Sequence, residues 1–194
     1  NNVITPKISK YFDGIETSGK RLIRTVDLIL NMSEIQVGVY EPTWSNFDLI
    51  KDVLDDINFE YSNYARRKGI DFILSSIIPC AEVYGDKYSI NQIFINLIDN
   101  AVKYTNMGKV EVIVETNEDN NITVAVADTG IGISEEFSKN MFELFMQEER
   151  GYSRKYEGNG LGLALVKKYC DLNKAEITVE SEKDIFFLDD VIQE

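Results

Sequence analysis

Three groups of residues in this 194-residue chain have types and spacings that suit phosphate or metal chemistry. In the first, Asn96, Asn100 and Lys103 recur at intervals of one helical turn, so they share one stripe of a helix. Such a stripe is ordinarily solvent-facing, but lysine and acids are its usual members and asparagine is a mediocre helix former. Two amides and an ammonium could instead hold a magnesium ion and a phosphate, because magnesium takes few protein ligands.

The second group is a turn with alternating glycines, Asp128-Thr129-Gly130-Ile131-Gly132-Ile133, directly after an expected strand. Glycine lets a ligand approach the backbone where a Cβ would clash. A carboxylate at the end of a strand can accept a hydrogen bond from an exocyclic amine such as that of adenine. An ordinary turn initiated by the aspartate explains the same pattern as readily.

The third group, Gly158-Asn159-Gly160-Leu161-Gly162-Leu163, opens a predicted helix. Its glycines leave N–H groups beside the positive end of that helix, which makes an anion site. The glycine spacing does not fit a Rossmann motif, and the sequence holds no P-loop pattern.

Between the second and third groups lie Phe142-x-x-Phe145 and a polar stretch, residues 147–157. The stretch holds Arg150, Arg154 and Lys155, and we interpret it as a mobile lid whose cations lie near the phosphates. An ordinary solvated loop is the alternative.

The hydrophobic pattern indicates which elements must position these groups. Strands are predicted at residues 43–47, 70–74, 109–116, 121–128, 175–180 and 185–188. Helices are predicted at residues 15–36, 48–68, 87–105 and 158–171. Gly69 should end the second helix, and the segment around Pro6 should be a loop. Strands paired antiparallel, with helices on one face, predict an α+β protein built as a two-layer sandwich.

The first three predicted helices carry informative apolar faces. In the first helix, apolar residues recur at near-heptad spacing and form a narrow seam: Ile15, Leu22, Val26, Ile29 and Met32. Such a narrow seam is typical of a coiled coil or a helical hairpin. No element precedes it, so we expect the chain to start inside a hairpin, with a boundary at residues 38–42. The predicted face of the second is Leu49, Val53, Ile57, Tyr61 and Tyr64. That of the third is Ile90, Ile93, Phe94, Leu97, Ile98, Ala101 and Val102.

Composition excludes several classes of function. The formal charge of −13, from 33 acidic and 20 basic residues, disfavours nucleic-acid binding. The chain has no histidine, so it cannot use imidazole catalysis, histidine-ligated metals or its own phosphohistidine. Cys80 and Cys170 are too few for a disulfide framework, and we expect both to be small buried hydrophobes. No apolar run long enough to span a bilayer and no signal segment occur, which favours a cytoplasmic chain or the cytosolic part of a membrane-bound sensor.

Taken in order, the boxes N-x-x-x-N-A-x-K-Y-T, D-x-G-x-G-I, F-x-x-F and G-x-G-L-G-L resemble the ATP-binding domain of the sensor histidine kinases. The resemblance spans residues 43–183, and residues 96–105 are similar to the family's asparagine box almost letter for letter. Upstream, residues 15–36, with Ser18-Gly19-Lys20-Arg21-Leu22, are similar to the second helix of the family's dimerisation hairpin.

The resemblance implies a Bergerat-type ATP-binding sandwich over residues 41–194, after a partial dimerisation and phosphotransfer hairpin over residues 1–40. ATP and Mg²⁺ are the implied cofactors, with Asn96, Asn100 and Lys103 as the catalytic group. Asn100 would hold magnesium, Tyr104 would lie against the base, Asp128 would bind the adenine amine and Lys103 would lie near the phosphates. The other implied nucleotide-binding residues are Gly130, Gly132, Ile133, Phe145, Arg154, Gly158, Asn159, Gly160, Leu161, Gly162 and Leu163.

The implied activity is that of a protein-histidine kinase, with in-line transfer of the ATP γ-phosphoryl group to a histidine outside this chain. That histidine would lie on the protein's own dimerisation hairpin, and a response-regulator receiver domain and a second copy in a homodimer are the other implied partners. Related gyrase-type ATPases carry a glutamate where Asn96 stands. An amide has no basic site at neutral pH, so it favours a domain that keeps ATP for transfer over one that hydrolyses it.

Two features depart from the family pattern. The phosphoacceptor histidine and its neighbouring acid are missing, and Glu182-Lys183-Asp184 stands where a glycine-rich hairpin usually precedes the last strand. The missing histidine leaves open a nucleotide-binding pseudokinase or sensor module without transfer. A serine kinase of the anti-sigma type is a further alternative, but those kinases lack a dimerisation helix like the one predicted at residues 15–36.

Overall fold

One long helix makes up most of the first of the two units into which the chain divides, Asn1–Glu41 and Pro42–Glu194. In the computed structural model, which describes residues 6–148 and 159–181, α1 spans Pro6–Val37. The segment around Pro6 is therefore helix and not the predicted loop, because proline fits the first turn, where its missing N–H would have no intrahelical partner. The predicted seam includes four exposed side chains, Ile15, Leu22, Val26 and Ile29.

A two-stranded antiparallel sheet opens the second unit. It pairs β1 (Trp44–Asp48) with β3 (Glu82–Asp86), and the rings of Trp44 and Tyr84 stack with centroids 6.0 Å apart. The sequence predicted β1 but not β3, because β3 is short and ends in Gly85 and Asp86, residue types that disfavour strands.

The larger sheet has three strands in the order β2–β4–β5, with β2 at Asp71–Ser76, β4 at Lys109–Thr116 and β5 at Ile122–Asp128. The β4–β5 hairpin is antiparallel as predicted, and Asn120 in its turn has a φ of 62°. The expectation of antiparallel pairing throughout is wrong, because β2 runs parallel to β4. Parallel neighbours need a long crossover, which β3 and the following helix supply. Residues 175–180 form no strand, and the predicted strand at 185–188 lies outside the described residues.

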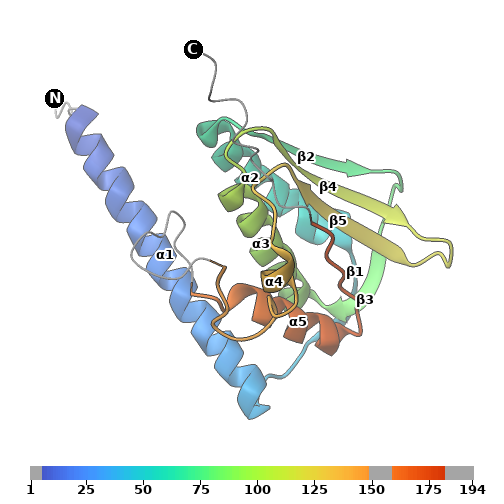
Figure 1. Cartoon of the computed structure of the whole chain (residues 1–194). Coiled ribbons are helices and arrows are strands. Elements are labelled where there is room, and N and C mark those ends of the chain that lie inside the picture. Colours follow the sequence, from blue (N-terminus) through green and yellow to red (C-terminus); the bar gives the residue numbers. More distant parts are fainter. Residues whose placement is uncertain (1–5, 149–158, 182–194) are drawn as a thin grey trace. The chain divides into compact units, whose positions relative to one another are not determined.

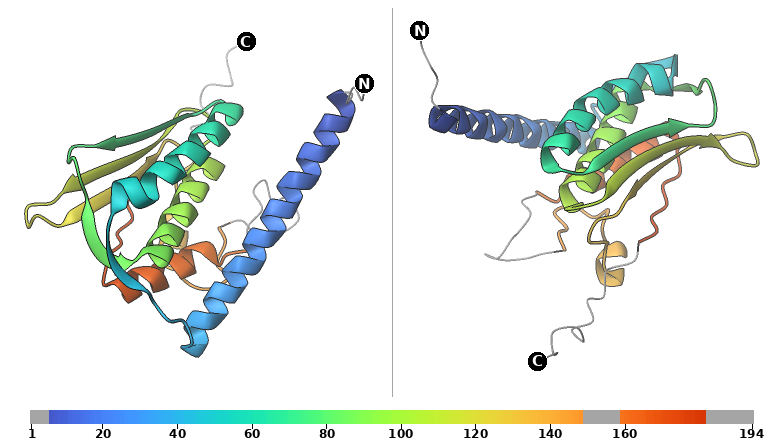
Figure 2. Two further views of the ribbon diagram at one scale, coloured as in Figure 1. Left: turned by 180° about the vertical axis from the view of Figure 1, so that it is seen from behind. Right: turned by 90° about the horizontal axis from the view of Figure 1, so that it is seen from above.

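Helices α2 (Asp55–Lys68) and α3 (Lys87–Tyr104) cover one face of this sheet (Figures 1 and 2). The predicted helix at 48–68 begins instead with a π-helical turn, Ile50–Leu54, and ends at Gly69 as expected, with a φ of 82°. Ala65 continues the buried stripe of α2, so the prediction that Tyr64 lies on this face is wrong. Between helices and sheet lies the core, which includes Val53, Leu54, Ile57, Tyr61, Phe94, Ile98, Val102, Val110, Val112 and Val114.

Two further helices complete the second unit. The short α4, Glu135–Ser138, was not predicted and starts at Ser134, whose hydroxyl accepts the Phe137 N–H. α5 spans Gly162–Asn173, so it starts four residues later than predicted. It buries Cys170, whose thiol pKa rises to about 11 because burial disfavours the thiolate. Cys80 is exposed, contrary to expectation.

These elements confirm an α+β protein with a two-layer helix-on-sheet arrangement and one long preceding helix. Across the part of the chain that the structure describes, every helix is too short or too polar to cross a bilayer.

A cluster of hydrogen bonds around Asp48 connects the end of β1 to the π-helical turn and to the segment before β3. Its Oδ1 accepts the N–H groups of Ile50 (3.1 Å) and Ala81 (3.3 Å). Its Oδ2 lies 3.0 Å from the Lys51 ammonium and 3.3 Å from the Cys80 sulfur. The hydrogen bond from Lys51, with smaller help from the other donors, holds the pKa of Asp48 well below its usual range.

The low pKa of Asp48 predicts a loss of stability in acid. An unfolded aspartate binds its proton with a pKa of 3.8, at higher pH than the folded one, so this stability is fully present well above pH 3.8 and is lost as the pH falls through it. Asp48→Asn should therefore flatten the decline of the thermal midpoint between about pH 5 and pH 2. Asp119→Asn, in the β4–β5 turn, is the matched control and should leave the slope unchanged. Parallel curves for Asp48→Asn and wild type would contradict the role given to this cluster.

Candidate functional site

The predicted polar stripe lies on α3, but its members differ in exposure. Asn96 is only 2% exposed, while Asn100 and Lys103 are half-buried. The Asn96 Nδ2 donates to the Gln92 carbonyl one turn earlier, at 2.8 Å. A purely solvent-facing stripe is therefore excluded for Asn96, because a buried amide at this position is covered by another part of the protein.

The covering element is the N-terminal end of α5. A Cβ built on Gly162 would lie 3.2 Å from the Asn96 Oδ1, so glycine allows the helix to start against this amide. The first and third motifs of the sequence thus meet at this contact. Leu161, at the N-cap of α5, offers no side-chain oxygen, and its own N–H is taken by the Asn159 Oδ1 at 3.1 Å. Among the described residues no side chain caps the N–H groups of the first turn of α5, so these groups can bind an anion.

The second motif meets the other end of α3. A Cβ on Gly130 would come within 2.8 Å of the Tyr104 carbonyl oxygen, so only glycine fits at this approach. The Asp128 Oδ1 accepts the Gly130 N–H at 2.8 Å, which is the aspartate-initiated turn that the sequence left as an alternative. The same oxygen lies 3.5 Å from the hydroxyl of the buried Thr105. Among the described residues no donor contacts the Oδ2, so the turn leaves this oxygen of Asp128 able to accept a further hydrogen bond.

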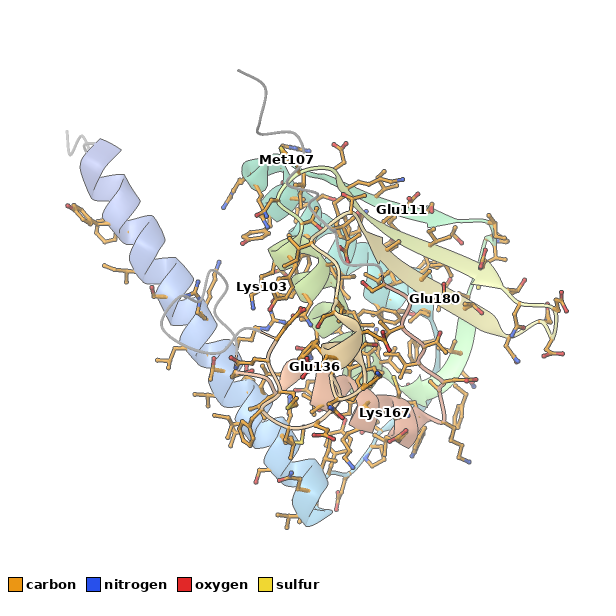
Figure 3. All side chains as sticks on the ribbon, in the orientation of Figure 1. Lys103, Met107, Glu111, Glu136, Lys167 and Glu180 are labelled. Carbon is orange, nitrogen blue, oxygen red and sulfur yellow. The ribbon has the colours of Figure 1, made fainter. Side chains whose placement is uncertain are left out.

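Lys103 and Tyr104 are coupled at this end of the helix. The Lys103 ammonium donates to the Tyr104 hydroxyl at 3.2 Å and lies 4.7 Å from the centroid of its ring. Figure 3 labels Lys103, together with Met107 in the turn that follows α3. This turn is fixed by Thr129, whose hydroxyl accepts the Lys109 N–H at 2.9 Å and donates to the Met107 carbonyl at 3.2 Å.

Phe145 joins the third motif through its backbone. Its N–H donates to the Gly160 carbonyl at 2.9 Å, and a Cβ on Gly160 would lie 2.6 Å from the Phe145 carbonyl carbon. Both residues have left-handed backbones, with φ of 63° at Phe145 and 69° at Gly160. The Phe145 side chain is 70% exposed, so the contact depends on the backbone and leaves the ring available to a ligand or partner.

The structure thus links all four boxes by close contacts, Tyr104 to Gly130, Asn96 to Gly162, and Phe145 to Gly160. Gly132 has the left-handed φ of 66° expected in a glycine turn, and the Ile133 N–H donates to the Ser181 hydroxyl at 2.9 Å. Leu161 is buried and Leu163 half-buried. Arg154, Gly158 and most of the predicted lid lie outside the described residues.

Sequence reasoning gave no role to Thr105 and Thr129, two hydroxyl residues that shape the site. Both lie inside the quoted boxes, so the signal was present. Their role was missed because a threonine in a turn or at a helix end commonly serves only the local backbone.

Comparison with known proteins places these boxes in a family. Residues 85–187 match the family described as histidine kinase-, DNA gyrase B-, and HSP90-like ATPases. The autoinducer 2 sensor kinase/phosphatase LuxQ of Vibrio vulnificus (strain YJ016) is 35% identical over 179 residues, 89% of this chain but only 21% of LuxQ. The chain therefore spans about a fifth of that relative's length.

Two solved structures are similar in fold. The crystal structure of full-length ShkA in complex with AMPPNP has a TM-score of 0.69 and 27% identity, and the match covers 87% of this chain and 34% of ShkA. The crystal structure of the histidine kinase ThkA in complex with the response regulator protein TrrA has a TM-score of 0.57 and 25% identity, and the match covers 74% of this chain and 41% of the ThkA chain.

The contact between Phe145 and Gly160 predicts a large effect for a single methyl group. Gly160→Ala places a Cβ against the Phe145 backbone and strains a left-handed residue, so we expect the free energy of unfolding to fall by about 1–3 kcal/mol. Gly19→Ala is the matched control, because that helical glycine has open space around its Cβ position and alanine favours a helix. Urea unfolding measures both. Equal stability of Gly160→Ala and wild type would contradict the contact.

Proposed function

Since the chain belongs to the family of histidine kinase-, DNA gyrase B- and HSP90-like ATPases, we propose that it is the ATP-binding catalytic portion of a two-component sensor histidine kinase. Its activity would be transfer of the γ-phosphoryl group of ATP to a histidine on another segment. The acceptor must lie outside these 194 residues, because they include no histidine. The observation that carries the proposal is the set of three close contacts that join the four boxes around α3.

The adenine base would bind at the C-terminal end of α3. The Asp128 Oδ2 would accept a hydrogen bond from the exocyclic amine, while the Oδ1 continues to accept the Gly130 N–H. Tyr104 would lie against the base, and Gly130, Gly132 and Ile133 would line the approach. The proposal is supported by the glycine at 130, which brings this turn against the Tyr104 backbone without a side chain in the way.

The phosphates would bind between α3 and the start of α5. The N–H groups of the segment from Gly158 to Leu163 would surround them, and Lys103 would supply positive charge. Phe145 and Arg154 would close the site from the segment between the glycine motifs. Asn100 would hold Mg²⁺ through its amide oxygen, as suits an ion that keeps most of its positions for water and phosphate. When bound, the ion would neutralise developing charge on the phosphate oxygens.

The protein's contribution to transfer would be positioning and neutralisation of charge. The bond between the γ-phosphorus and the bridging oxygen breaks, ADP leaves with that oxygen, and the phosphorus bonds to an imidazole nitrogen of the acceptor. Asn96 cannot take a proton from water at neutral pH, and its Nδ2 is held by the Gln92 carbonyl. The site would therefore keep ATP intact until the acceptor arrives.

We further propose that residues 1–40 supply the second helix of the dimerisation hairpin and that residues 41–194 form the ATP-binding domain. The exposed apolar side chains of α1, among them Ile15 and Leu22, support a partner helix along this seam. The hairpin would carry the acceptor histidine and hold two copies together. A response-regulator receiver domain would take the phosphoryl group onward, as the ThkA complex with TrrA suggests, and we place these events in the cytoplasm.

The magnesium assignment predicts a selective loss in Asn100→Ala. Without its amide oxygen the variant should bind ATP equally well with Mg²⁺ and with EDTA, whereas wild type should bind more tightly with Mg²⁺. Calorimetry in the two buffers measures this difference. Asn91→Ala, on the same helix, should keep the wild-type response to the ion. Full magnesium dependence in Asn100→Ala would mean that the polar stripe does not hold the metal.

The proposed transfer predicts labelling in trans. Incubated alone with radiolabelled ATP, this chain should gain no acid-labile phosphate, because it has no histidine. Mixed with a hairpin that carries the acceptor histidine, it should label the hairpin, and Asp128→Asn should abolish labelling by presenting a donor where the adenine amine needs an acceptor. If wild type binds ATP but labels no verified hairpin, the chain is a nucleotide-binding module without transfer.

A further inference from the structure

A polar cluster that joins the half-buried Asn173 to two buried residues, Ser89 and Asp86, lies at the far end of α5 from the glycine motif. Asn173, the last residue of that helix, makes three hydrogen bonds with its amide. Its Nδ2 donates to the Ser89 hydroxyl at 2.8 Å and to the Tyr169 carbonyl at 2.9 Å, and its Oδ1 accepts the Asp86 N–H at 2.9 Å. One side chain therefore ties α5 both to the first turn of α3 and to the end of β3.

The partners of Asn173 are themselves held firmly. Ser89 is fully buried and Asp86 is 2% exposed. The Asp86 Oδ2 caps α3 by accepting the Ser89 N–H at 3.0 Å, and its Oδ1 accepts the N–H of Thr43, just before β1, at 2.9 Å. A Cβ on Gly85 would lie 3.1 Å from the Asn173 Oδ1, so a glycine in β3 leaves room for the amide. These bonds favour one arrangement, because loss of the Asn173 amide would leave the N–H of the buried Asp86 unpaired.

Between this cluster and Gly162, α5 buries mostly apolar surface. Its buried side chains there are Ala164, Leu165, Val166 and Tyr169. Burial of apolar surface is non-directional, so it fixes the position of α5 along its own axis less sharply than hydrogen bonds do. Directional bonds set that position, and Asn173 makes them at one end, while the close approach of Gly162 to Asn96 limits the other.

We infer that Asn173 is a positioning residue for the phosphate-binding turn at the opposite end of α5. A 12-residue helix is a stiff rod of about 18 Å, so a shift at its anchored end moves its N-terminal turn relative to α3. Asn173 thereby sets the distance and orientation of the N–H groups of that turn relative to the bound phosphates. The inference rests on the proposed function, since it takes this turn to bind the phosphates of ATP.

The effect should separate phosphate binding from base binding. In Asn173→Ala the anchor is lost, and we expect affinity for ATP to fall about fivefold, on the scale of one lost hydrogen bond. Affinity for adenosine, which lacks phosphates and would be held by Asp128, should stay within experimental error of wild type. A merely structural role would lower the two affinities together, by reducing the folded fraction.

The experiment measures ATP by calorimetry and adenosine by competition, on the full 194-residue chain. Ser89→Ala removes the hydroxyl that accepts from Asn173 and donates to the Asp86 carbonyl, so it should shift the ATP-to-adenosine ratio in the same direction. This variant carries the test if Asn173→Ala does not fold. Asp171→Asn is the matched control. It breaks an exposed ion pair with Lys167 in the same turn of α5 and should leave the ratio unchanged.

Three results can be told apart. A fall in ATP affinity with adenosine binding retained supports the positioning role. Unchanged affinities, or equal losses for both ligands, overturn it even though wild type binds ATP. Failure of wild type to bind ATP overturns the proposed function itself and this inference with it.

Discussion

Helix α3 is buried on two different sides, and the second unit is arranged around that constraint. Its apolar side packs on the sheet through Phe94, Ile98 and Val102. Its polar side holds Ser89 and Asn96, which are also buried and must therefore be hydrogen-bonded. α5 provides the cover, and it can approach Asn96 so closely only because residue 162 is a glycine. The site is thus a consequence of covering a polar helix face with another helix.

Amides suit this face for an electrostatic reason. The chain carries a formal charge of −13, and a triphosphate adds further negative charge. A carboxylate at position 100 would hold a cation but would also repel the phosphates, whereas an amide oxygen can coordinate a metal without a net charge. Local geometry, with N–H groups from a helix end and the Lys103 ammonium, can then attract an anion within an acidic protein.

The sequence was most informative where a local rule decides the structure. The periodicity of α3, the β4–β5 hairpin and the stop at Gly69 were all predicted, because each depends on neighbouring residues. The boxes predicted the family and a candidate site, but not that Asn96 is buried, since burial depends on α5 packing across it. The parallel pairing of β2 with β4 and the short β3 could not be predicted either. Strand direction and pairing are set by partners distant in sequence, and the pattern of β3 is too short to stand out.

The parallel pairing has a consequence for how the protein folds. Ser76 of β2 lies beside Val114 of β4, 38 positions further along the chain, whereas β4 and β5 are joined by a tight turn. The hairpin closes a small loop and can form quickly, but β2 joins only after the long intervening segment, including α3, has been drawn together. We therefore expect assembly of the sheet and docking of α3 to be one cooperative event, in which the helix that carries the asparagines reaches its final place only when the sheet is complete.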